Sequence, residues 1–284
     1  MIVPLSALFA AGHALFRARG FEVREIRSGA RRVLAYDRAG KGRAPPLVLV
    51  HGLGGSAASF AGLAALLLPV ARRVLVVDLP GHGRNPLLAG EEGATVLEQD
   101  SAVRAVLASV GERAVLVGSS LGGALSLHAA ATEPDRVAGV VGLSPAGAPL
   151  AGEARSRVLQ AFRGGLDGAR ELPARLYARP PRLAWLVTRD LGRHFAAPPV
   201  RALLENLVAA DDPGMRPETL DRIRQPVLIL WGEADGILPR ASVEFFRSHL
   251  RRGTVEVLPV CGHLPHVEQR QIVAARIARF LAEL

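Results

Sequence analysis

Short apolar runs alternate regularly with longer segments of helical periodicity along this chain, and few folds accommodate that alternation. The runs LVLV, VLVV and VLIL are continuously apolar, which is typical of central parallel strands covered on both faces. The pattern therefore predicts βα units around a mostly parallel sheet. The predicted strands are residues 22–27, 32–37, 46–50, 73–78, 114–117, 137–143, 227–231 and 254–258. The predicted helices are residues 57–68, 96–110, 121–132, 240–250 and 272–281.

The rhythm changes in two places. The first two predicted strands leave no room for a helix between them and should form an antiparallel hairpin. Between Pro145 and Arg224 the chain shows helical patterns punctuated by Pro and Gly, and the βα rhythm resumes at PVLILWG. We therefore expect an inserted helical cap over the end of the sheet. The predicted division is an N-terminal helix over 1–19, a core over 20–145 and 225–284, and a cap over 146–224.

The composition excludes several classes of protein. With 49% apolar residues over 284 residues, the chain can bury a full core and is not disordered. Lys+Arg 35 against Asp+Glu 26 gives a net charge of +9, but the Arg residues recur beside acids along the whole chain, without a basic run. We therefore expect no nucleic-acid partner. The single cysteine, Cys261, excludes an internal disulfide and is compatible with a cytoplasmic location.

The apolar stretch at the N-terminus, residues 3–16, lacks a preceding basic region and is interrupted by Ser6, Gly12 and His13. This pattern favours a short helix over a signal peptide. We expect the helix to lie on the domain or to make weak contact with a membrane surface. No segment reaches the roughly 20 uninterrupted apolar residues of a membrane span. The sequence defines no oligomeric state.

The strongest local motif is VLVGSSLGGALSLHAA, in which a predicted strand runs into a tight turn and then directly into a helix. This is the context of a nucleophile elbow, with Ser120 as the nucleophile. Small residues at Gly118 and Gly122 allow strand and helix to pack closely around a strained serine. The rival hydroxyl, Ser119, lacks a Gly two residues before and two after it, so we interpret Ser119 as a pocket-wall or packing residue.

A serine hydroxyl needs a base to accept its proton, and the base needs a carboxylate to orient it. His263 follows the last predicted strand and is the predicted base, with His266 as the local rival. After the strand 227–231, the loop contains Glu233 and Asp235, and Asp235 is the predicted acid. Both predicted partners lie at the carboxyl edge of the sheet, where Ser120 also lies. No spacing typical of metal ligands is present, and we expect no cofactor.

The order Ser, Asp, His along the chain is that of the α/β-hydrolase fold. With the motifs HGLGGS, DLPGHGR, WGEADGILP and GHLPHVEQ in this order, residues 20–284 resemble the α/β-hydrolase superfamily, in its serine-nucleophile branch with a helical cap. The resemblance implies a mostly parallel eight-stranded sheet flanked by helices. It also implies an oxyanion hole formed by the backbone N–H groups of Leu53 and Leu121.

The implied reaction is a two-step acyl transfer through Ser120. We expect hydrolysis of carboxylic esters of apolar small molecules, as in an esterase or lipase, with Gly52, Ser119, Trp185 and His266 in the substrate pocket. One alternative is a carbon–carbon bond hydrolase acting on ring-cleavage diketo acids, which would use cap arginines such as Arg193. A second is a non-catalytic small-ligand receptor with the same fold. Thioesterase, lactonase, perhydrolase and acyltransferase activities also stay open.

Overall fold

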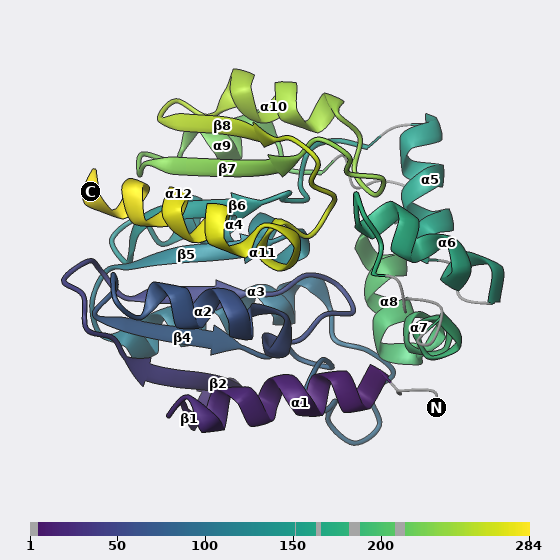
Figure 1. Cartoon of the computed structure of the whole chain (residues 1–284), viewed down its shortest axis with the longest axis horizontal. Helices are drawn as coiled ribbons and strands as arrows, with labels where there is room; N and C mark the ends of the chain where they lie inside the picture. Colours follow the sequence, from purple (N-terminus) through teal and green to yellow (C-terminus); the bar gives the residue numbers. More distant parts are fainter. Residues whose placement is uncertain (1–4, 151, 163–165, 182–187, 208–213) are drawn as a thin grey trace.

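The computed structural model describes residues 5–150, 152–162, 166–181, 188–207 and 214–284. Its centre is a sheet of eight strands in the order β1-β2-β4-β3-β5-β6-β7-β8 (Figure 1). The hairpin β1–β2 is antiparallel, β2 is antiparallel to β4, and the other neighbours are parallel. The strands are Glu22–Ser28, Arg31–Ala39, Leu47–Val50, Arg73–Val77, Ala114–Ser119, Val137–Leu143, Val227–Gly232 and Gly253–Leu258. The predicted fold class is therefore confirmed.

Helices cover both faces of the sheet because its central strands are apolar on both sides. In β3, Leu47 and Leu49 face one hydrophobic cluster while Val48 and Val50 face the other, and all four side chains are fully buried. The first face is covered by α1 (Leu5–Ala18), η1 (Ala57–Phe60), α2 (Ala61–Leu67), α11 (Pro265–Glu268) and α12 (Arg270–Ala282). The second is covered by α3 (Val96–Val110), α4 (Leu121–Thr132) and α10 (Ala241–His249).

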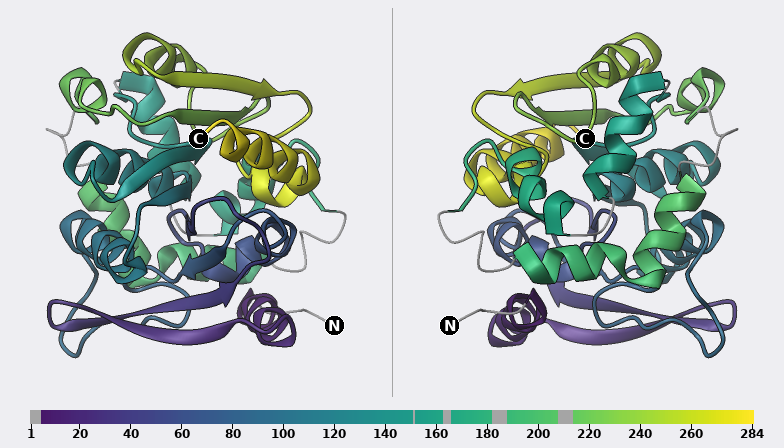
Figure 2. Two further views of the ribbon diagram at one scale, coloured as in Figure 1. Left: turned by 90° about the vertical axis from the view of Figure 1, so that its left-hand side faces the viewer. Right: turned by 90° about the vertical axis from the view of Figure 1, so that its right-hand side faces the viewer.

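The insertion between β6 and β7 is helical in the described residues. It contains α5 (Gly152–Phe162), α6 (Leu166–Leu176), α7 (Thr188–Ala196), α8 (Pro198–Leu207) and α9 (Pro217–Asp221). The first four of these helices stand together beyond the carboxyl ends of the strands (Figure 1; Figure 2, right). In contrast, α9 packs against α4 and α10, which belong to the core. The inserted helices thus form a cap over the edge where parallel sheets place their ligands.

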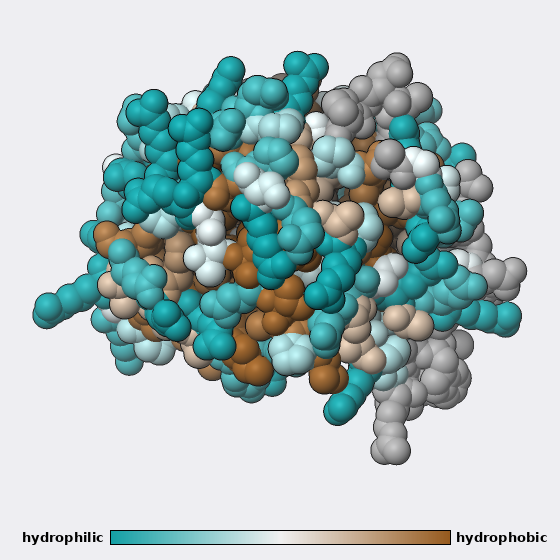
Figure 3. All heavy atoms as spheres, turned by 90° about the horizontal axis from the view of Figure 1, so that it is seen from above, coloured by the Kyte–Doolittle hydropathy of each residue, from teal (hydrophilic) through white to brown (hydrophobic). Residues whose placement is uncertain are grey.

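Most arginines lie on the outer surface, as the sequence predicts. Seen from the β8 side, hydrophilic residues cover most of the visible described surface, with apolar residues in smaller patches (Figure 3). Several arginines form ion pairs with acidic residues. Examples are Arg276–Glu256 and Arg247–Glu244, both with N···O distances of 2.7 Å. Such exposed pairs contribute little to stability individually. Arginines such as these are therefore solvated and paired with acidic residues.

The N-terminal helix α1 packs on the domain. Phe16 is fully buried, and its ring stacks on that of Tyr36 at a centroid distance of 4.6 Å. A Cβ at Gly12 would collide with Ala58 of η1, so the helix backbone lies close to the core. None of the helices among the described residues combines the length and apolarity that crossing a membrane requires.

We predict that Phe16→Ala destabilises the protein by about 3–5 kcal/mol, because it removes a large buried side chain from the contact between α1 and β2. The matched control is Leu15→Ala, since the Leu15 side chain is 38% exposed and should cost less than about 1 kcal/mol. Urea unfolding followed by circular dichroism measures both values. Equal effects of the two substitutions would contradict this assignment of the core.

Candidate active site

Ser120 lies between β5 and α4 in a strained backbone conformation, with φ 52° and ψ −117°. The turn is tight because Gly118 approaches Gly122 and because Gly122 approaches the carbonyl oxygens of Val50 and His51, so a Cβ at either glycine would collide with backbone atoms. The Ser120 N–H donates to the Leu143 carbonyl of β6 at 3.1 Å. This geometry is that of a nucleophile elbow and directs the serine away from the sheet.

His263 and Asp235 form a buried hydrogen-bonded pair. The distance from His263 Nδ1 to Asp235 Oδ2 is 2.7 Å, and the two side chains are 3% and 1% exposed. The other carboxylate oxygen, Oδ1, accepts the N–H groups of Ile237 at 2.9 Å and Leu238 at 3.0 Å. In this pair Nδ1 of His263 faces the carboxylate, and Nε2 has no hydrogen-bond partner among the described residues.

The rival residues lie elsewhere. The residue Glu233 is exposed, and its side chain has no hydrogen bond to the described residues. The ring of His266 is buried and stacks on Phe60 at a centroid distance of 4.4 Å. Ser119 is buried at the end of β5, and its hydroxyl has no partner among the described residues. The structure thus pairs His263 with Asp235 and leaves each rival outside that pair.

A cavity of about 430 Å³ opens beside Ser120 and is walled mainly by apolar side chains. Leu53 and Leu121 line it together with Ser120, and neither N–H donates a hydrogen bond to another described residue. Both donors are therefore available to an oxyanion. The further walls come from the core and the cap: Val96, Leu97, Ala124, Leu125, Ala146, Ala148, Leu150, Val158, Phe162, Leu204, Leu207, Met215, Ile237 and Leu238.

The four residues predicted to line the substrate pocket lie at different places relative to this cavity. Ser119 and His266 do not line this cavity, because the first is enclosed in the sheet and the second is stacked against Phe60. Gly52 is also absent from the cavity wall, but it lies beside the serine: a Cβ there would be 3.7 Å from Ser120 Oγ. Trp185 lies outside the described residues.

His51 holds the loop that carries Leu53. Its Nδ1 is 2.8 Å from the Gly52 carbonyl oxygen, and its Nε2 accepts the Leu79 N–H at 3.0 Å. Nδ1 therefore carries the proton and donates, and the ring is neutral. Burial lowers the pKa of His51 to about 4. The loop after β3 is thus tied to the end of β4 by a histidine that does not titrate near neutral pH.

The cap is bonded to this same loop. His194 of α7 places Nε2 2.7 Å from the Gly54 carbonyl oxygen. Gly54 has φ +67° and lies against the ring of Phe195, so a side chain there would be both strained and blocked. In the sequence, His194 is an ordinary residue of a helical segment. No local signal could have revealed this contact, since 140 residues separate the two partners.

The end of α6 is bonded to both loops that carry the His263–Asp235 pair. The carbonyl of Arg175 accepts the Gly236 N–H at 3.0 Å, and the carbonyl of Leu176 accepts the His263 N–H at 2.8 Å. Glu268 adds a second link, because its carboxylate accepts the N–H groups of Ala178 at 2.9 Å and Gly262 at 2.7 Å. The cap therefore helps to position the two loops that carry Asp235 and His263.

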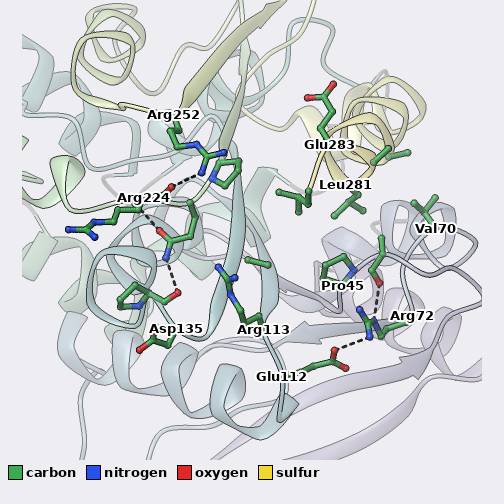
Figure 4. Close-up of a pocket in the computed structure, with 18 of the residues that line it drawn as sticks. Pro45, Val70, Arg72, Glu112, Arg113, Asp135, Arg224, Arg252, Leu281 and Glu283 are labelled. Atoms are coloured by element: carbon green, nitrogen blue, oxygen red, sulfur yellow. Dashed lines mark hydrogen bonds and ion pairs between the residues drawn. The ribbon is translucent and has the colours of Figure 1, made fainter.

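A larger hollow of about 1640 Å³ lies at the opposite edge of the sheet, where the strands begin (Figure 4). Two arginines in its walls have these partners: Arg72 pairs with Glu112 at 3.1 Å, and Arg252 donates to the Arg224 carbonyl at 3.2 Å. Ligands of open α/β sheets bind outside the carboxyl ends of the strands. This hollow is therefore separate from the candidate active site. No cluster of described His, Cys, Asp or Glu could hold a metal ion.

Comparison with known proteins assigns the chain to one family. The Alpha/beta hydrolase family matches residues 47–276. The chain belongs to the alpha/beta hydrolase family. The superfamily resemblance and the enzyme class predicted from the sequence are thereby confirmed, and the chain is an α/β-hydrolase enzyme.

Individual relatives within this family differ in activity. The dihydrolipoyllysine-residue acetyltransferase component of an acetoin cleaving system from Pseudomonas putida is 31% identical, over 99% of this chain and 75% of that protein. A pimeloyl-[acyl-carrier protein] methyl ester esterase from Neisseria meningitidis serogroup C is 30% identical, over 82% of this chain and 92% of that one. A solved membrane phospholipase A is 26% identical with a TM-score of 0.82, covering 98% of this chain and 91% of its own.

We predict that buried neutral histidines make the fold sensitive to acid. Burial lowers the pKa of His266 from 6.5 to about 3. The unfolded chain therefore takes up a proton that the folded chain excludes as pH falls below about 6.5, and stability is lost. His266→Phe keeps the stack on Phe60 without titrating. Between pH 7 and pH 5 we expect its unfolding free energy to fall by about 1–2 kcal/mol less than that of the wild type, measured by urea titration at each pH. If the unfolding free energies of the wild type and His266→Phe changed equally with pH, His266 would not be the source of the acid sensitivity.

We predict that His194 positions the loop that carries Leu53, one of the two proposed oxyanion donors. His194→Phe keeps an aromatic ring in α7 but removes the hydrogen bond to Gly54, so kcat should fall about tenfold with little change in KM. His194→Gln places an amide N–H near the position of Nε2 and should restore most of the activity. Steady-state kinetics of the two variants measures these effects. An equal loss of kcat in both variants would mean that the hydrogen bond to Gly54 does not position the loop.

Proposed function

We propose that this enzyme cleaves carboxylic esters of apolar substrates through an acyl-enzyme on Ser120. The proposal rests on the observation that the groups needed for the reaction lie at one edge of the sheet. The strained serine, two available backbone donors and an apolar cavity meet at the carboxyl edge of the sheet, and the buried His263–Asp235 pair follows strands at the same edge. These are the groups that acyl transfer by a serine hydrolase requires.

In the proposed reaction, Ser120 Oγ attacks the ester carbonyl while His263 Nε2 accepts the hydroxyl proton. The N–H groups of Leu53 and Leu121 stabilise the negative charge on the tetrahedral intermediate. His263 then returns the proton to the departing alcohol, which leaves an acyl group on Ser120. A water molecule, deprotonated by His263, attacks that acyl group; His263 then returns the proton to Ser120 Oγ as the carboxylic acid is released. Asp235 holds the imidazole in the required tautomer and stabilises its charged form throughout.

The relatives support ester chemistry without defining the substrate. One of the proteins described above is named as a methyl ester esterase and another as a phospholipase A. The carbon–carbon hydrolase alternative shares the elbow, the predicted triad and the cap, and would use cap arginines to bind a substrate carboxylate. Arg193 pairs with Asp190 at 3.8 Å and does not line the cavity, whereas two other arginines of the insertion, Arg155 and Arg216, do line it. We retain the ester hydrolase as the main proposal because these two named relatives act on esters, and the diketo-acid hydrolase becomes an outcome of its test.

The expected partner is a small apolar ester. Weak contact of α1 with a membrane surface and a cytoplasmic location stay predictions. So do the boundaries of the N-terminal helix, core and cap.

The test compares hydrolysis of p-nitrophenyl esters from acetate to palmitate by the wild type, Ser120→Ala and Ser119→Ala. We predict that Ser120→Ala lowers kcat/KM about a thousandfold or more, whereas Ser119→Ala stays within a few fold of the wild type. The acyl length with the highest kcat/KM reports the depth of the cavity. Inert esters together with turnover of a ring-cleavage diketo acid would replace the proposal with the carbon–carbon hydrolase. Turnover of neither substrate would contradict the proposed substrate class.

A further inference from the structure

The helix that begins at the candidate nucleophile also forms one wall of the cavity. Leu121, Ala124, Leu125 and His128 all line it, and their spacing of three and four residues places them on one face of α4. Eight residues of helix separate Ser120 from His128, which corresponds to about 12 Å along the axis. The cavity therefore has a reacting end at Ser120 and a far end at His128.

The far end of the cavity is polar, whereas the wall between Ser120 and His128 is apolar. His128 Nδ1 lies 2.7 Å from Oδ1 of Asp100, a residue of α3 that also lines the cavity. The other carboxylate oxygen of Asp100 lies 2.9 Å from Arg104 Nε. The Asp100 side chain is only 7% exposed, whereas that of His128 is 45% exposed. No described residue bonds to Nε2 of His128, so this nitrogen is accessible to a ligand.

The charges at this end favour an anion. The hydrogen bond to Asp100 raises the pKa of His128, which favours the protonated ring with an N–H at Nε2. Asp100 is already shared between His128 and Arg104, and it is the acidic residue among the described residues that line the cavity. Arg216, which lines the same cavity, is a permanently charged cation.

We propose that the preferred substrates are esters whose acyl chain ends in a carboxylate, and that His128 binds this distal carboxylate. The inference rests on the proposed ester hydrolysis at Ser120, and it narrows the apolar substrate to one whose acyl chain is apolar only between the ester and a terminal carboxylate. An acyl chain of about eight to ten carbon atoms, with C–C bonds near 1.5 Å in a zigzag, spans the distance between the two ends. The apolar middle of the cavity accommodates the methylene groups, and His128 selects the group at the far end of the chain.

The test uses two esters that differ only at the far end of the chain: the mono-p-nitrophenyl ester of suberic acid, with a free carboxylate, and p-nitrophenyl octanoate, with a methyl group. Both acyl chains have eight carbon atoms. We expect the wild type to have the higher kcat/KM on the suberate ester. His128→Leu should lower kcat/KM about tenfold or more on the suberate ester, mainly through KM, because a charge-assisted hydrogen bond is lost. Its kcat/KM on the octanoate should stay within about twofold.

The control variant is His249→Leu, which removes a half-buried histidine on α10 that bonds the Phe245 carbonyl and does not line the cavity. It should change neither substrate's kinetics. Equal losses on both esters in His128→Leu would overturn the proposal, as would a wild type that favours octanoate, because His128 would then have no role in recognising the carboxylate.

A binding measurement separates this inference from the proposed reaction. Calorimetry of Ser120→Ala with monomethyl suberate and with methyl octanoate should give about tenfold tighter binding of the suberate, and the added substitution His128→Leu should abolish the difference. If no ester is hydrolysed but this difference is found, the proposed function fails and the carboxylate site stands. If esters are hydrolysed but the two ligands bind equally, the carboxylate site fails and the proposed function stands.

Discussion

The close approach of strand and helix around Ser120 underlies the geometry of the whole site. Gly118 and Gly122 have no room for a side chain, because backbone atoms of α4 and of the end of β3 occupy the space. This packing holds Ser120 in a conformation that a non-glycine residue rarely adopts. The strain is sustained by the fully buried central strands on either side. A serine at the same place in a looser turn would not be directed at the cavity.

The cap does more than cover the cavity. Through His194 it is bonded to the loop that carries Leu53, and through the end of α6 it is bonded to the loops that carry Asp235 and His263. Each of these contacts joins a cap helix to a backbone group beside a candidate catalytic residue. A movement of the cap would therefore alter the positions of the proposed oxyanion donors and base, so cap geometry and catalytic geometry are coupled in this fold.

The structure contains two histidine–carboxylate pairs, His263–Asp235 and His128–Asp100, whose surroundings give them different properties. The His263–Asp235 pair is enclosed, and both oxygens of its carboxylate are occupied by one histidine and two backbone N–H groups. The His128–Asp100 pair is half open to solvent, and its carboxylate is shared with Arg104. The first arrangement suits proton transfer in a site shielded from water, and the second suits electrostatic recognition of a ligand.

Local sequence patterns were enough to establish the βα order, the hairpin, the position of the elbow and the choice of family, because each depends on periodicity or motifs within short segments. They narrowed the acid to Glu233 or Asp235 and the base to His263 or His266. Only the folded chain shows which acid bonds to which histidine: Asp235 bonds to His263, while His266 stacks on Phe60. The cavity wall, the contact of His194 with Gly54 and the place of His128 at the far end of α4 likewise emerged only from the folded arrangement. They join residues from separate helices and loops, and their meeting depends on how those elements pack rather than on any local pattern.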